Sequence, residues 1–81
     1  MFITLTNASP AHKGKKITLN TANIVTIWRG DAVRAADEDG KPTETEEVTF
    51  VFVPPHGTWE VEEQHDDIIK MLVSEASAQI F

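Results

Sequence analysis

Hydrophobic and polar residues alternate along several short segments of the chain, and this two-residue period is typical of β-strands with one buried face. Residues 2–6 and 16–20 place Ile3, Leu5, Ile17 and Leu19 on the inward side, with threonines between them. Residues 24–29, 47–53 and 58–62 continue with β-branched and aromatic residues, which favour sheets. The pattern therefore predicts five strands, separated by turn segments rich in Pro, Gly and Asn.

The C-terminal segment changes to the period of a helix. Ile68, Ile69, Leu72 and Val73 recur at spacings of three and four, and acidic residues precede them where they suit the positive end of a helix dipole. One amphipathic helix covering a sheet is the simplest way to bury an apolar sheet face. We therefore predict an α+β fold, a small antiparallel β-sheet of about five strands followed by one C-terminal α-helix packed on one face.

Residues 1–81 are too few for more than one domain. Within it, residues 30–47 are crowded with acidic side chains around Gly40 and Pro42 and lack a sustained apolar stripe. The alanines and Val33 of this segment are able to extend the preceding strand, and we predict that its centre is a mobile acidic loop closing a β-hairpin, with a charged protein-contact loop as the alternative to a merely solvated one. Asp37 and Asp39 do not match the calcium loop of an EF-hand.

Residues 47–53 form the most apolar strand, because Phe50 and Phe52 occupy one face and Val51 and Val53 the other. One helix covers only one face, so the other face is predicted to self-associate or to bind a partner. In so small a domain the aromatic side chains are more often core residues, and that alternative stays open. The candidate partner-binding residues are Val51, Val53, Trp28, Trp59, Phe81, Asp37, Glu38 and Asp39.

The net charge of −6 disfavours direct binding to nucleic acid, because phosphate backbones are also negative, and a basic protein surface is a more natural partner. No cysteine is present, which fits a reducing compartment. The N-terminal residues are too short and polar a run for a secretory signal, and no apolar run reaches the roughly 18 residues that span a bilayer. We predict a cytoplasmic protein without membrane contact.

Catalytic chemistry has little support in the sequence. His12, His56 and His65 show neither metal-ligand spacing nor a paired nucleophile. No loop has the glycine pattern that cradles phosphates. We therefore predict no catalytic residue, no metal site, no cofactor and no enzymatic activity.

Several short stretches resemble the FlbD/SwrD proteins linked to flagella and swarming. They are Ile3-Thr4-Leu5-Thr6-Asn7, Gly14-Lys15-Lys16-Ile17-Thr18-Leu19-Asn20, Ile24-Val25-Thr26-Ile27, and Val61-Glu62-Glu63 through Asp67-Ile68-Ile69. The resemblance implies the same order of strands and closing helix, but the chain departs from it by a longer first hairpin, by residues 30–47 and by the turn at residues 54–59. The stretches at residues 5–15 and 52–59 are similar to small proteins of tailed bacteriophages, which implies a phage or prophage origin. Neither resemblance implies catalytic residues.

These observations predict a non-enzymatic protein-interaction or structural module that is able to self-associate as a homo-oligomer. Two alternatives stay open, an acidic modulator that binds a basic host enzyme and a motility-related regulator. The small hydrolase or metal enzyme serves as the contrasting hypothesis.

Overall fold

The computed structural model describes the backbone of residues 1–80 and the side chains of residues 1–74. It confirms the α+β fold with five strands and a C-terminal helix. The elements are β1 (Phe2–Thr6), the 3-10 turn η1 (Pro10–His12), β2 (Lys16–Asn20), the 3-10 turn η2 (Thr21–Asn23), β3 (Thr26–Ala36), β4 (Pro42–Val53), β5 (Gly57–Val61) and α1 (His65–Ile80).

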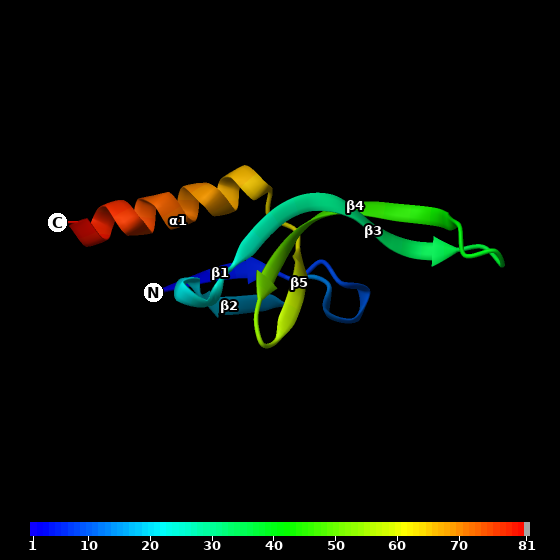
Figure 1. The fold of residues 1–81 in the computed structure, drawn as a ribbon, viewed down its shortest axis with the longest axis horizontal. Helices are drawn as coiled ribbons and strands as arrows, with labels where there is room; N and C mark the ends of the chain where they lie inside the picture. The colour runs from blue at the N-terminus through cyan, green and yellow to red at the C-terminus, as the bar shows by residue number, and fades with distance from the viewer. Residues whose placement is uncertain (81) are drawn as a thin grey trace.

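The five strands form two small antiparallel sheets rather than one. β1 pairs with β2, and β3, β4 and β5 pair in that order. The end of β1 then runs onto the free edge of β5, where Asn7 bridges Val61 and the Glu62 N–H donates to the Thr6 carbonyl at 2.9 Å. The first sheet is thus joined to the second through the last strand (Figure 1).

The main core lies between the two sheets. Its buried members come from both sheets and from the first turn of α1, and they are Ile3, Leu5, Leu19, Val51, Val53, Val61 and Ile68. Ile17, Ile24, Ile27, Trp59 and Leu72 pack around them. Ile68 and Leu72 of the predicted helical stripe therefore face the body, whereas Ile69 and Val73 are exposed. The helix begins at His65, after the acidic pair Glu62 and Glu63.

Residues 30–47 are not the loop that their acidity predicts. β3 continues to Ala36 and β4 starts at Pro42, so only residues 37–41 form the tip. Asp37 closes that tip, because its Oδ1 accepts hydrogen bonds from the backbone N–H groups of Asp39 and Lys41, both at 2.9 Å. The two strands project from the body as an arm, in the direction opposite to α1 (Figure 1). The alanines and threonines of this segment give only a weak alternation of apolar and polar residues. The pairing between β3 and β4 nevertheless keeps both segments in strand conformation.

Candidate interaction surface

The inner face of the β3–β4–β5 sheet holds two of the residues predicted to bind a partner. Val51 has no exposed surface and Val53 retains 8%. Both contact the core between the sheets, so in this fold neither side chain is available to another protein. The prediction correctly found two apolar faces on β4 but chose the covered one, because β1, β2 and α1 all pack on the valine side.

Trp59 also lies on the inner face. It stands opposite Val51 in the β4–β5 register and packs against the core at its margin. Its indole stacks on the imidazole of His56, with ring centroids 4.2 Å apart and planes 12° from parallel. The stack joins the turn at residues 54–56 to the following strand and leaves Trp59 half-buried, so its role as a partner contact stays a prediction.

The outer face of the same sheet is where aromatic side chains remain accessible. Trp28 is 41% exposed and lies opposite Phe50 in the β3–β4 register. The two rings stack at a centroid distance of 5.2 Å and an interplanar angle of 18°. Phe52, two residues along β4, is half-buried on the same side. We call Trp28, Phe50 and Phe52 the outer aromatic face.

The Phe50 ring also covers Gly30. A Cβ atom added to Gly30 would lie 3.2 Å from Cε2 of Phe50, tighter than ordinary van der Waals contact. The absence of a side chain at Gly30 therefore lets the aromatic ring approach the backbone of β3 closely.

Toward the arm, the outer face is closed by a buried arginine. Arg34 donates from Nε to Glu46 at 3.1 Å, from Nη1 to Glu60 at 2.8 Å and from Nη2 to the Ala8 carbonyl at 3.1 Å. Its side chain is only 12% exposed. Beneath it, Ala8, Ala32 and Val48 form a second small core, with Phe50 packed at its side.

The ion pairs of this cluster shift the pKa values of Glu46 and Arg34. The hydrogen bond from Arg34, then that from Lys13, lowers the pKa of Glu46. The hydrogen bond to Glu60 raises the pKa of Arg34 against the opposing effect of burial. The cluster fixes the segment after β1 across the arm-side half of the outer face, and the half around Trp28 stays open.

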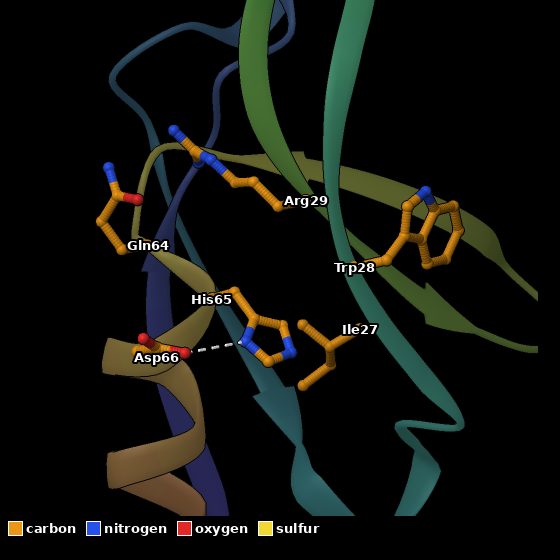
Figure 2. A pocket seen from close by; sticks show the side chains of 6 residues that line it. All are labelled: Ile27, Trp28, Arg29, Gln64, His65 and Asp66. Carbon is orange, nitrogen blue, oxygen red and sulfur yellow. Dashed lines mark hydrogen bonds and ion pairs between the residues drawn. The ribbon is translucent and has the colours of Figure 1, made fainter.

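A shallow groove of about 490 Å³ runs between β3 and the start of α1, lined by Ile27, Trp28, Arg29, Gln64, His65 and Asp66. Figure 2 shows Ile27 and His65 pointing toward one another, while Trp28 points to the opposite side of the strand. His65 Nδ1 lies 3.2 Å from Asp66 Oδ1. The groove is bounded on one side by β3, which is an edge strand.

A buried polar chain fixes the position of the helix start beside this groove. Arg29 Nη1 donates to Thr49 Oγ1 at 2.9 Å, and Thr49 Oγ1 donates to the Glu63 carbonyl at 2.6 Å. The Glu63 carboxylate in turn accepts from the N–H and the hydroxyl of Thr6. Sequence patterning missed this role of Thr49 and Glu63, because it links residues far apart along the chain.

The histidines lie on separate elements: His12 in η1, His56 in the turn before β5 and His65 at the start of α1. Among the described residues, no group of three His, Asp or Glu side chains gathers in a way that could hold a metal ion. Glu38 and Asp39 are exposed at the tip of the arm beside Asp37. Phe81, the remaining predicted contact, lies outside the described residues.

Comparison of the chain with protein-family models, with curated proteins and with solved structures gave no match. Within residues 1–80, no helix has both the length and the apolar character needed to cross a membrane.

Proposed function

We propose that this protein is a non-enzymatic protein-interaction module that contacts its partner through the outer aromatic face. The single observation that carries the proposal is that Trp28, which is 41% exposed, stacks on the half-buried Phe50. Aromatic side chains are enriched at the centres of protein interfaces, where they bury a large area at low entropic cost. Core packing explains the inner face of this sheet but leaves part of Trp28 exposed to water.

The rigidity of the surface supports the same proposal. Gly30 lets Phe50 approach β3 closely, and the ring of Phe50 stacks on that of Trp28. A side chain already held in one orientation loses less entropy on binding than a mobile one. The outer aromatic face is thus pre-organised for contact with an apolar or aromatic surface.

The experiment is an affinity capture with three immobilised forms of the chain: wild type, Trp28→Ala and Phe2→Ala. Phe2 is the matched control, because it is 69% exposed but lies on the other sheet. We expect a protein that wild type and Phe2→Ala retain at high salt and that Trp28→Ala loses. Equal capture by all three forms, or none by any, contradicts the proposal.

A second candidate is an acidic contact surface for a basic partner such as a host enzyme that binds nucleic acid. It is supported by the arm, which carries Glu38 and Asp39 exposed at its tip and projects away from the body. Opposite charges across an interface accelerate association and make the complex salt-sensitive.

Charge reversal separates the second candidate from the first. The variant Glu38→Lys/Asp39→Lys should lose a partner that high salt also releases. The control Glu62→Lys/Asp67→Lys changes the net charge equally at exposed positions before and within the first turn of α1. If the control loses the partner to the same degree, net charge and not the arm is responsible.

The two sequence resemblances add proposals about context. A phage or prophage origin fits a small interaction module that acts in the host cytoplasm, and the FlbD/SwrD resemblance favours a regulator of motility. Expression of wild type and of Trp28→Ala in a swarming bacterium distinguishes them: a swarming defect that depends on Trp28 favours the motility role, and unchanged swarming counts against it.

A further inference from the structure

The free edge of β3 carries a charge pattern that is complementary to itself. β3 has one strand neighbour, β4, among residues 1–80, so on its other side alternate backbone N–H and C=O groups lack a strand partner. Around Gly30, the strand reads Ile27, Trp28, Arg29, Gly30, Asp31, Ala32 and Val33. Ile27, Arg29, Asp31 and Val33, an apolar residue, a cation, an anion and an apolar residue, thus follow one another on one face of the strand, and Gly30 lies at the centre of this series on the other face.

Antiparallel pairing of this edge with the same edge of a second copy, centred on Gly30, brings these groups into register. Arg29 then stands opposite Asp31 of the second copy, and Asp31 opposite Arg29, so two ion pairs flank the two-fold axis. On the same face Ile27 stands opposite Val33 twice. Residues directly opposite in an antiparallel pair lie on one face and interact, and opposite charges there are favourable.

A charge at the edge that has no ion-pair partner favours a second copy of the chain as the binding partner. Asp31 is exposed, and its carboxylate has no hydrogen bond or ion pair to any described residue. It lies opposite Glu47 in the β3–β4 register, and like charges in that position repel. Arg29 pairs with Glu47 through Nε at 2.9 Å and with Thr49 through Nη1, which leaves further guanidinium N–H groups free. A second copy supplies the cation that Asp31 lacks.

The regular part of the β3 edge extends nearly equally far on both sides of Gly30. The β3–β4 register shifts after Val33, and β3 begins at Thr26, so the regular stretch is nearly symmetric about Gly30. Gly30 has no side chain to meet its own copy at the axis. The groove of about 490 Å³ beside Ile27 and Arg29 offers space at this edge for another chain.

We infer that two copies of the chain associate through antiparallel pairing of their β3 edges around Gly30, which joins their three-stranded sheets into one. Such a contact is isologous, because the same residues meet from both copies, and it closes as a dimer. Addition of a strand to an exposed sheet edge is an established mode of recognition. The inference rests on the proposed interaction function and names a second copy as one partner.

Light scattering after gel filtration tests the inference on the full chain. Wild type should give about twice the 9.0 kDa mass of one chain. Arg29→Asp makes the register carry only anions and Asp31→Arg only cations, so each variant alone should lose the dimer. An equimolar mixture of the two variants should recover it, because every like-charge pair becomes an opposite-charge pair.

Two further variants control for charge and folding. Glu38→Arg makes the same charge change as Asp31→Arg at the tip of the arm, outside the register, and should stay dimeric. Circular dichroism checks that each variant folds. If Arg29→Asp does not fold, Val33→Lys takes its place, because Val33 is 55% exposed and lies opposite Ile27 in the dimer; it should be monomeric.

A monomeric wild type overturns the inference, and so does a dimer that Asp31→Arg leaves intact or a mixture that stays monomeric. These results are separable from failure of the proposed function. A monomeric wild type that still captures a protein through Trp28 overturns the dimer alone. A dimer with no Trp28-dependent partner overturns the proposed role of the outer aromatic face alone.

Discussion

The two faces of the β3–β4–β5 sheet are nearly equal in apolar content but differ in how much of each is buried. On the inner face, Val51 and Val61 have no exposed surface, because a second sheet and a helix cover them. On the outer face, Phe50 and Trp28 stack on each other and only the arm-side half is covered. Apolar composition thus identifies a strand with two hydrophobic faces, while the path of the rest of the chain decides which face is buried.

The largest expected difference between the faces comes from a carboxylate placed on each. Val51→Asp puts an unpaired charge into the fully buried core, which costs several kcal/mol and should abolish the cooperative urea transition. Thr58→Asp, exposed on the outer face opposite Phe52, should change the midpoint little. Comparable losses from both variants would show that the inner face is not the buried one.

Loss of the buried hydroxyl on the inner face should have the next largest effect. Thr49→Val keeps the shape but removes the donor to the Glu63 carbonyl and the acceptor for Arg29. Two polar groups then lose a partner, which should lower the free energy of unfolding by about 1–3 kcal/mol. Thr45→Val, the same change at an exposed position of β4, is the control, and an equal loss there would rule out the hydrogen bonds of Thr49 as the cause.

The two tryptophans sharpen the comparison further. Trp28→Ala removes a partly exposed ring whose stack on Phe50 is worth about 0.5–1.5 kcal/mol beyond the area that it buries, so the free energy of unfolding should fall by at least that amount. Trp59→Ala removes a ring packed against the main core and should cost more. Urea unfolding followed by circular dichroism measures both, and the reverse order would mean that the outer face contributes more to folding than the inner one.

The smallest expected effect is electrostatic and depends on pH. Because Arg34 lowers the pKa of Glu46 below 4.5 in the folded state, ionised Glu46 stabilises the fold above that value. The contribution disappears as the pH falls through the lowered pKa. Urea midpoints of Glu46→Gln and wild type should therefore differ near pH 7 and converge in acid. A constant difference down to pH 3 would contradict the assignment.

The sequence predicts the number and order of the strands and the C-terminal helix, because local periodicity governs them. Periodicity also shows which residues share a face, but it does not show which face another element covers, so it does not reveal that Val51 is buried. The hairpin at residues 30–47 follows from the sequence, but the length of its strands does not, because alanine and threonine give a weak strand signal and acidic residues suggest a loop.

The side chains that hold distant segments together were also beyond sequence reasoning. Arg34 looks like a surface residue until strand register brings Glu46 and Glu60 beside it. Glu63 looks like a helix-start acid until the end of β1 lies against it. The outer aromatic face can be predicted in part, since Trp28 is among the predicted contacts and Phe50 lies in a predicted strand with two apolar faces.

The hydrogen bonds from Thr6 to the Glu63 carboxylate have a consequence for folding during biosynthesis. The first strand leaves the ribosome early, but the residues that hold its end in place are translated 57 positions later. Contacts so distant along the chain form slowly, because a long loop must close first. Until then the core around Leu5 lacks Val61 and Ile68, so the packing of β1 is complete only after β5 and the start of α1 have been made.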